Sequence, residues 1–364
     1  MFKRIILIIL SVVFYSGCRQ SALQLPFDDI VYVETFPHSY ELEGGCVIDF
    51  GKIGIQDLMI CDTLLLLSSQ NQSGFISSIN LRTGMASKDF LRRGNAFGEV
   101  LYMPFFSTVN KVSRNGKTCL VHSDNKGNLL CWCPEDLYDE DYPDIEMLTD
   151  SVPVNSFYTL YVNDSTFICR NVSGDASRQE RYLLASGKRE TTGSMDKLNS
   201  LSIPVKGDGY MFNILSSFSR YNKDRDVVVE ASLMLNTIYL YSLDRQFERA
   251  ICYGSRVDNI NDVFQRGLTG LRETFTRLNI YDDFFAVMYD GGKMYEELNF
   301  LKSNPEILIF DWNGNPVAKL DLPCPADVFD IDVSSGTLFT LDREREVIRK
   351  YDIFDVMKVL AGLN

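Results

Sequence analysis

The sequence predicts an all-β fold in which one unit of about 50–60 residues is repeated around a closed ring. Polar turns alternate with short runs rich in Val, Ile, Leu, Phe and Tyr from about residue 45 to about residue 355, which is typical of strands joined by tight turns. Helical periodicity is scarce, and its best candidates are 263–275 and the C-terminal FDVMKVLAGL. Two glycines interrupt the first candidate, so we expect a loop insertion there.

Six polar turns each precede an apolar strand and recur at similar distances along the chain. A second strand and a small-residue turn follow several of them, as in ISSINLRTG at 76–84 and ILIFDWNGN at 307–315. A unit of this length with about four short strands has the size of a propeller blade. We therefore predict a six-bladed β-propeller, with seven blades as the nearest alternative. The six turns are marked by Asp62, Gly116, Asp164, Asp224, Asp282 and Gly336, at intervals of 54, 48, 60, 58 and 54 residues.

Ring closure follows from the two apolar faces of such a blade, because each face needs a neighbouring blade to cover it. Extra strand-like segments, IVYVETF and CVIDFG, lie within residues 30–60. One of them can complete the last blade and so join the N-terminal part of the domain to its C-terminal part. The propeller domain is predicted to span residues 30–364.

Residues 1–18, MFKRIILIILSVVFYSGC, have the pattern of a secretory signal. Lys3 and Arg4 form a basic segment, residues 5–15 are too short an apolar run to span a bilayer comfortably, and small residues precede Cys18. The Tyr-Ser-Gly-Cys ending resembles the lipobox of bacterial lipoproteins, in which the cysteine thiol is acylated. An ordinary secreted protein with an incidental Cys18 is the alternative.

This lipobox resemblance implies a signal peptide over 1–17 and a lipid-anchored linker over 18–29, with palmitate-type chains on the cysteine. Two or more acyl chains suffice for stable anchoring to a membrane. The resemblance also implies the outer membrane, because Arg19 stands where an Asp marks retention in the inner membrane. The acidic run associated with surface export is missing from RQSALQLP. We therefore expect the protein to lie in the cell envelope and to face the periplasm.

The formal net charge of −13 excludes two classes of partner. Nucleic acids and anionic membrane surfaces are both bound through basic patches, which an acidic chain does not favour. The apolar run LMICDTLLLLSS at 58–69 is interrupted by Asp62, so a turn that enters a buried strand explains it better than a membrane span.

The cysteines after Cys18 are even in number, which permits disulfides in an exported protein. Most of them lie inside apolar, strand-like runs, so we expect buried free thiols that pack as small hydrophobic groups. Cys131 and Cys133 place two thiols on one face of a strand, but no second pair or nearby histidine completes a metal site. The cysteines concerned are Cys46, Cys61, Cys119, Cys131, Cys133, Cys169, Cys252 and Cys324.

No set of residues with catalytic or metal-binding spacing is found in the sequence. The only two histidines are His38 and His122, and the second lies in the apolar strand CLVHS, which favours a core or channel position. A G-x-S-x-G motif is absent. We assign no catalytic residue, no metal ligand and no resident cofactor, with Ca²⁺ in an acidic loop as the alternative. The densest acidic stretch, which we expect to be a solvated loop, is Asp139, Glu140, Asp141 and Asp144.

Two patterns stand out in the sequence: the turn Arg93-Gly94-Asn95-Ala96-Phe97-Gly98-Glu99 and the closing segment SSGTLFTLDREREVIRKYD. They resemble the R-G-x-G-P-G-E turn and the final blade of TolB-like six-bladed propeller lipoproteins of Bacteroides-type bacteria. The chain keeps Arg93, Gly94, Gly98 and Glu99 but has Ala and Phe where the family has Gly and Pro. If the turn needs a positive φ where the Ala stands, the substitution costs on the order of 1 kcal/mol. The resemblance implies fold and location more than activity.

These observations favour a lipid-anchored envelope propeller that acts as a binding module. We expect a monomer that meets the membrane through its lipid and binds a protein or a small ligand. The longest insertions, at 134–155, 187–209 and 253–275, indicate its working face. The alternative is a metal-dependent hydrolase or lactonase in which Glu, Asn and Asp from different blades converge on the channel. A purely structural envelope subunit is a third possibility.

Overall fold

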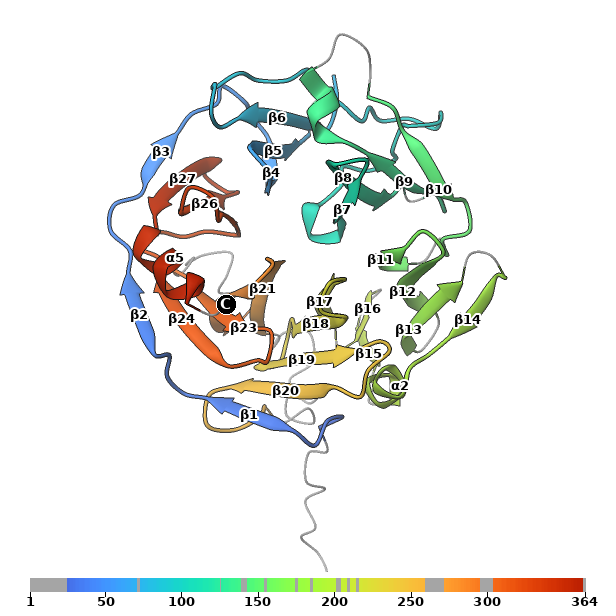
Figure 1. Cartoon of the computed structure of the whole chain (residues 1–364), viewed down its shortest axis with the longest axis vertical. Coiled ribbons are helices and arrows are strands. Elements are labelled where there is room, and N and C mark those ends of the chain that lie inside the picture. The colour runs from blue at the N-terminus through green and yellow to red at the C-terminus, as the bar shows by residue number, and fades with distance from the viewer. Residues whose placement is uncertain are drawn as a thin grey trace, which may run out of the picture.

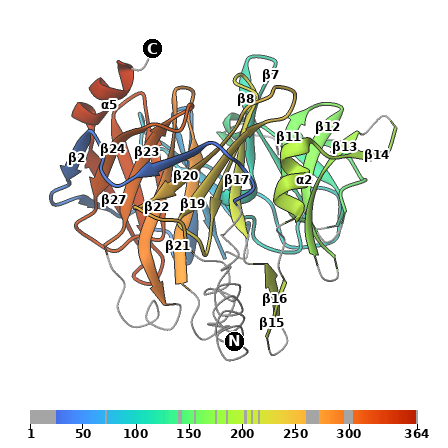
Figure 2. The same ribbon diagram turned by 90° about the horizontal axis from the view of Figure 1, so that it is seen from below.

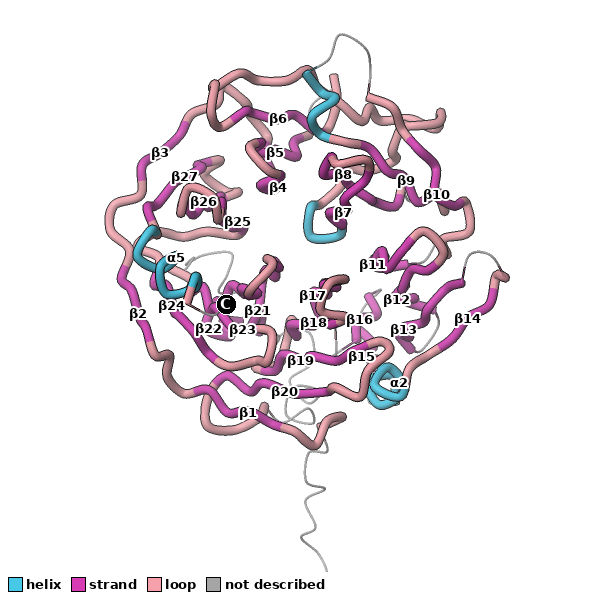
Figure 3. Tube along the Cα trace, in the orientation of Figure 1, coloured by secondary structure: helices cyan, strands magenta, loops and turns pink. Residues whose placement is uncertain are grey.

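Sheets arranged around a central axis form a β-propeller in the computed structural model (Figure 1). The first strand of each sheet lies nearest the axis, and the later strands lie progressively outward (Figure 3). Within the described part of the chain, no helix is both long and apolar enough to cross a bilayer. The structure describes residues 25–70, 73–124, 126–138, 143–153, 156–173, 176–183, 186–200, 204–207, 210–213, 216–258, 272–294 and 304–362.

We number the sheets 1 to 6 in ring order, and the first three come from the N-terminal half of the chain. Sheet 1 contains β4 (Ile55–Cys61), β5 (Leu64–Ser69) and β6 (Ile76–Asn80). Sheet 2 contains β7 (Asn110–Arg114), β8 (Lys117–Ser123), β9 (Leu129–Trp132) and β10 (Glu146–Thr149). Sheet 3 contains β11 (Ser156–Asn163), β12 (Thr166–Ser173), β13 (Ala176–Leu183) and β14 (Lys188–Glu190).

The other three sheets each receive an additional strand from the N-terminal segment. Sheet 4 contains β17 (Ser217–Asn222), β18 (Val227–Ser232), β19 (Thr237–Ser242), β20 (Glu248–Tyr253) and β1 (Ile30–Val33). Sheet 5 contains β21 (Arg272–Ile280), β22 (Phe284–Met294), β23 (Glu306–Asp311), β24 (Pro316–Asp321) and β2 (His38–Glu41). Sheet 6 contains β25 (Val328–Asp332), β26 (Thr337–Asp342), β27 (Val347–Asp352) and β3 (Cys46–Ile48).

A few elements lie outside these sheets. The hairpin of β15 (Pro204–Gly207) and β16 (Tyr210–Asn213) projects from one end of the ring (Figure 2). The described residues include the α-helices α2 (Gly193–Ser200) and α5 (Phe354–Ala361) and the 3₁₀ helices η1 (Phe106–Thr108) and η2 (Pro134–Tyr138). The C-terminal helix candidate is thus confirmed as α5. Most of the other candidate, 263–275, lies outside the described residues, and β21 begins at Arg272.

The six marker residues of the predicted repeat occupy the same position in their sheets. Each of the six markers lies in the turn between the first and second strands of its sheet, from Asp62 between β4 and β5 to Gly336 between β25 and β26. All six turns therefore lie at the same end of the ring, which we call the turn end. An apolar cluster fills each junction between neighbouring sheets, as expected for units that cover each other's faces.

The blade count differs from the prediction. Five sheets have four or five strands and form five blades, whereas six were predicted. Sheet 1 has only three strands and does not form a full blade. Residues 86–90 follow the edge of β6 but form only isolated bridges with it, at Ile79–Ala86 and Ile76–Phe90. The Ser87 hydroxyl accepts the Ser78 N–H at 2.9 Å, so a side chain replaces the backbone partner that a regular fourth strand would supply.

Residues 30–48, which we call the N-terminal belt, run around the outside of three consecutive sheets (Figure 1). The belt pairs in parallel with β20 through β1 and with β24 through β2, and antiparallel with β27 through β3. Because β27 is the last strand of the chain, β3 completes the last sheet and closes the ring. The expectation that an N-terminal segment would join the C-terminal blade is confirmed.

One cysteine pair departs from the expectation of free thiols. Leu120 and Trp132 are direct cross-strand partners in sheet 2, which places Cys119 and Cys133 opposite each other, and these two form a disulfide. The prediction was therefore wrong for this pair. It is confirmed for Cys61, Cys131, Cys169 and Cys252, which are free and buried. Cys46 is free but exposed, and Cys324 is free and half-buried.

Candidate functional site: a polar pocket in the channel

A cavity of about 360 Å³ opens at the turn end of the central channel, and we call it the channel pocket. The innermost strands build its wall, each with a residue near its C-terminal end, just before the inner-hairpin turn. Because the turns are aligned, the side chains reach the axis at a similar depth. One such residue per strand, from β4 to β25 in ring order, is Met59, Val112, Tyr161, Arg220, Asn279 and Asp330.

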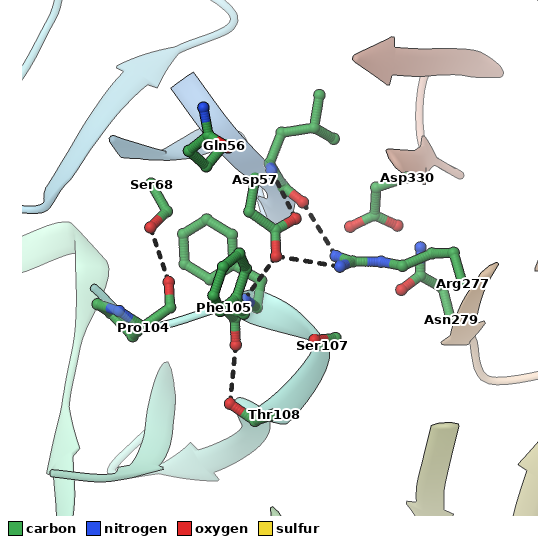
Figure 4. A network of polar contacts seen from close by, with 12 residues as sticks. Gln56, Asp57, Ser68, Pro104, Phe105, Ser107, Thr108, Arg277, Asn279 and Asp330 are labelled. Atoms are coloured by element: carbon green, nitrogen blue, oxygen red, sulfur yellow. Dashed lines mark hydrogen bonds and ion pairs between the residues drawn. The ribbon is translucent and has the colours of Figure 1, made fainter. Parts of the chain in front are cut away.

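The short helix η1 lies in the middle of the ring, where it contacts the inner strands of three different sheets. A buried ion pair holds its first turn: Asp57 of β4 accepts a hydrogen bond from the Phe106 N–H at 2.8 Å and pairs with Arg277 of β21 at 3.0 Å (Figure 4). Both charged side chains are almost completely buried. A buried charge is tolerated when it is paired and hydrogen-bonded, so this pair fixes η1 across the channel.

Arg220 of β17 connects η1 to the channel pocket. Its guanidinium donates to the carbonyl oxygens of Phe106 (2.8 Å) and Ser107, and the same side chain lines the pocket. It is only 8% exposed, yet no carboxylate of the described residues lies within ion-pair distance of it. Burial, and next the nearby Arg277 charge, lower the pKa of Arg220 to about 10, so it remains charged at neutral pH.

Asp330 of β25 faces the same pocket but already has its hydrogen bonds supplied. Its carboxylate accepts from the Ile60 N–H at 2.7 Å, from the Ile331 N–H at 2.9 Å and from the Tyr281 hydroxyl at 2.7 Å. Burial, with the Asp330 charge, raises the pKa of Tyr281 well above its usual value, so the tyrosine stays a donor. Lys111 Nζ lies 4.0 Å from the carboxylate, at the outer limit of an ion pair.

Two asparagines of the wall join neighbouring inner strands. Asn110 of β7 donates to the Thr159 carbonyl at 2.8 Å, and Asn279 of β21 donates to the Phe329 carbonyl at 2.6 Å. Each bond links one sheet to the backbone of the next. The wall of the pocket is therefore held in place by the same contacts that hold the sheets together.

A metal-dependent hydrolase needs Glu, Asn and Asp side chains from different sheets to converge in the channel. Asn110, Asn279 and Asp330 from different sheets do converge there, as that alternative requires. Among the described residues, however, no group of three or more His, Cys, Asp or Glu is placed to hold a metal ion. The Asp57 carboxylate is paired with Arg277, and Asp330 is bonded as described above.

The turn 93–99 lies between sheets 1 and 2 and outside the channel pocket. The Glu99 carboxylate accepts the Ala96 N–H at 2.9 Å, and a Cβ on Gly94 would lie 1.9 Å from Glu99 Oε2, so the carboxylate needs glycine there. The residue with positive φ is Gly98 (78°), and Ala96 is not among those with positive φ. Arg93 stacks over the Phe75 ring at 5.5 Å. This geometry is that of a structural connection, because the Glu99 carboxylate is bonded within the turn itself.

Other residues from the sequence analysis fall outside the channel pocket. Cys18 and the stretch 139–141 lie outside the described residues. His122 lies in the core, as expected, and its Nδ1 accepts from Trp132 Nε1 at 3.2 Å, while its Nε2 is buried with no partner. His38 is exposed on β2.

The sequence analysis missed the charged side chains of the channel, namely Asp57, Arg220 and Arg277. A signal was available, because each is a charged residue inside a strand that otherwise reads as buried: IQDLMIC, SFSRYN and RETFTRLNI. A charge in such a run needs a partner, and three of them in equivalent innermost strands indicate a shared polar interior.

Comparisons with known proteins identify no family for the chain. No protein-family model and no curated protein matches it. A member of the DUF4221 family from Bacteroides vulgatus has a similar structure, with 9% identity, a TM-score of 0.48 and coverage of 87% of this chain and 95% of that one. A Bacteroides fragilis protein whose description proposes that it is exported has 10% identity, a TM-score of 0.46 and coverage of 89% and 98%. The propeller arrangement is established by the strand pairing of this chain itself.

Proposed function

We propose that the protein is a binding module that takes a small polar molecule into the channel pocket. The observation that supports this most directly is the pocket wall: the innermost strands all contribute to it, and a buried guanidinium faces it with only backbone carbonyls as partners. Preformed concave sites with a few convergent polar groups are the usual form of small-molecule sites. Side chains that also join the sheets hold this site rigid, which lowers the entropy cost of binding.

The proposal is non-catalytic and includes no resident cofactor. The two carboxylates nearest the axis are already bonded to donors, which leaves neither as an evident general base. The only two histidines of the chain lie in the core of sheet 2 and on the outer belt.

The proposal is tested by comparing ligand binding to the wild type with ligand binding to a variant whose channel pocket is filled by a larger side chain. The full-length protein in mild detergent is screened against small polar compounds by thermal unfolding, because a ligand of the native state raises the unfolding temperature by mass action. Ser113, exposed on β7 and lining the pocket, is replaced by tryptophan to fill it. The matched control is Val333→Trp, at an exposed position near the turn end that does not line the pocket.

We expect compounds that stabilise the wild type to lose their effect on Ser113→Trp and to keep it on Val333→Trp. Hits that stabilise Ser113→Trp as strongly as the wild type would place binding elsewhere and refute the proposal.

We also propose that the module is anchored as a monomer to the outer membrane through acylated Cys18, and faces the periplasm. The resemblance of residues 1–18 to a lipobox and the resemblance of two patterns to TolB-like lipoproteins support this part of the proposal. Metabolic labelling with a palmitate analogue tests it: the wild type should incorporate label and Cys18→Ser should not. Cys46→Ser, which removes an exposed thiol of the belt, is the matched control and should be labelled. Protease digestion of intact cells should leave the domain uncut.

A further inference from the structure

The charged side chains around the channel pocket differ in how completely their hydrogen bonds are already supplied, and this difference indicates what the pocket binds. Asp57 and Arg277 neutralise each other as a buried pair. Asp330 carries one negative charge, whereas Arg220 and Lys111 carry two positive charges. The remaining charges of the wall, on Lys223, Asp224 and Asp282, are exposed at the rim, where water and salt screen them more than buried charges. Arg220 is thus the buried cation of the wall, and no carboxylate of the described residues lies within ion-pair distance of it.

Arg220 has unused donors. A guanidinium carries five N–H groups, and the two hydrogen bonds of Arg220 go to the Phe106 and Ser107 carbonyls of η1. Those two bonds fix the orientation of the planar group before any ligand arrives. Two other buried arginines are different, because Arg170 of β12 pairs with Glu230 at 2.8 Å and Arg277 of β21 pairs with Asp57.

Lys111 supplies a second cation from β7. Its side chain is 39% exposed. Asp330, its ion-pair partner among the described residues, is 4.0 Å away and already accepts three other hydrogen bonds. The ammonium can therefore turn toward a ligand without leaving Asp330 unsatisfied.

We propose that the channel pocket binds a small anion with a carboxylate or phosphate group, which Arg220 and Lys111 hold by charge-assisted hydrogen bonds. Arg220 acts as the fixed planar donor and Lys111 as the mobile one. The hydroxyl and amide groups of Tyr161, Asn110 and Asn222 surround the rest of the ligand. This inference rests on the proposed function, and it assigns the class of ligand.

Probes of equal chain length and different charge test the inference. Succinate, succinamide and putrescine carry negative, zero and positive charge on similar four-carbon chains, and inorganic phosphate distinguishes a phosphate site from a carboxylate site. Binding to the full-length protein is measured by calorimetry and by thermal unfolding. The variants are Arg220→Met, Arg220→Lys and Lys111→Met, with Lys350→Met as the control at an exposed lysine of β27.

We expect succinate or phosphate to bind, and succinamide and putrescine not to bind. Lys111→Met should weaken anion binding by about tenfold or more, Arg220→Met should abolish it, Arg220→Lys should restore part of it, and Lys350→Met should change nothing. If Arg220→Met does not fold, the inference is judged on the other two variants: anion binding that neither Lys111→Met nor Arg220→Lys weakens would contradict it.

Two contrary outcomes are distinguishable. Binding of succinamide or putrescine that Ser113→Trp blocks would overturn the anion assignment and leave the pocket as a binding site. Absence of any ligand that Ser113→Trp blocks, in this panel and in the wider screen, would overturn the proposed function as well.

Discussion

The two halves of the ring finish the outer edges of their sheets differently, although the inner hairpins are alike. In sheets 4 to 6, the N-terminal belt adds β1, β2 and β3 to the outer edge. Sheets 1 to 3 receive no belt strand, and their outermost strands are β6, β10 and β14. Sheets 1 to 3, which we call the unbelted half, contain a disulfide between β8 and the residue after β9, and the 3₁₀ helices η1 and η2. An unpaired strand edge is a liability, and the two halves manage it by different means.

The difference teaches where the ring depends on long-range contacts. The belt joins residues that are about 300 positions apart in sequence at β3 and β27. In the channel, Asp57 of sheet 1 pairs with Arg277 of sheet 5, and Arg220 of sheet 4 binds the η1 carbonyls between sheets 1 and 2. The two halves are therefore connected on the outside of the ring by backbone pairing and at the central axis by charged side chains.

The largest expected effect comes from breaking the connection at the axis. Asp57→Ala leaves the Arg277 guanidinium buried without a counter-charge, which should lower the free energy of unfolding by about 3–5 kcal/mol. Urea denaturation measures the change. Asp57→Leu combined with Arg277→Met should cost less than Asp57→Ala alone, since no lone charge is then buried. Asp355→Ala, which breaks the exposed pair with Lys358, is the control and should change little. Equal losses for Asp57→Ala and the double variant would show that the pair is not what holds η1.

The disulfide of the unbelted half should contribute the next largest effect. Cys119 and Cys133 are 14 residues apart, and closing a loop of this length stabilises the fold by roughly 3 kcal/mol through the entropy of the unfolded chain. Cys119→Ala/Cys133→Ala should lose about that much, and a reducing agent should destabilise the wild type but not the double variant. Cys131→Ala, at a buried free thiol of the same sheet, serves as the control. A wild type that is insensitive to reduction under unfolding conditions would contradict the prediction.

What the sequence could predict follows the same division between local and long-range features. The six inner-hairpin turns were predictable because each depends on a few neighbouring residues, as Asp62 and Gly116 show. The belt was predictable in part, because CVIDFG reads as a strand with no local partner. The three-stranded sheet 1 was not, since residues 86–90 form only isolated bridges with β6 and the Ser87 hydroxyl takes one of the backbone partners. Nor were the partners of Asp57 and Arg277, which are 220 residues apart, because a charge in an apolar strand shows the need for a partner but not its identity.

The pH dependence of stability should identify His122 in the unbelted half. Burial lowers its pKa to about 4, from 6.5 in the unfolded chain, because the charged form loses its hydration. The unfolded chain therefore takes up the proton first, so this contribution is full above pH 6.5 and is lost as the pH falls toward 4. Between pH 7.5 and 4.5 the loss should be about 2–3 kcal/mol.

Urea denaturation at the two pH values, on the wild type and on His122→Gln, isolates this contribution from that of the carboxylates. His122→Gln should not show this loss of stability between pH 7.5 and pH 4.5. His38→Gln, which removes the exposed imidazole of the belt, should retain it. The same pH response in the wild type and His122→Gln would exclude the buried imidazole as its cause.

The smallest expected effect tests the belt directly with matched prolines. Val47 in β3 and Met147 in β10 are both exposed residues of outermost strands, and a proline at either position costs on the order of 2 kcal/mol or less of strand pairing. Only Val47→Pro weakens the joint that closes the ring.

The readout uses the two tryptophans of the chain, Trp132 in the unbelted half and Trp312 in the half that carries the belt. In variants that keep only one of them, tryptophan fluorescence reports the unfolding of that half alone. Val47→Pro should lower the unfolding midpoint seen by both, because an open ring exposes a face on each side of the break, whereas Met147→Pro should act mainly on Trp132. If both prolines affect only the tryptophan of their own half, the belt strengthens its own sheets without closing the ring.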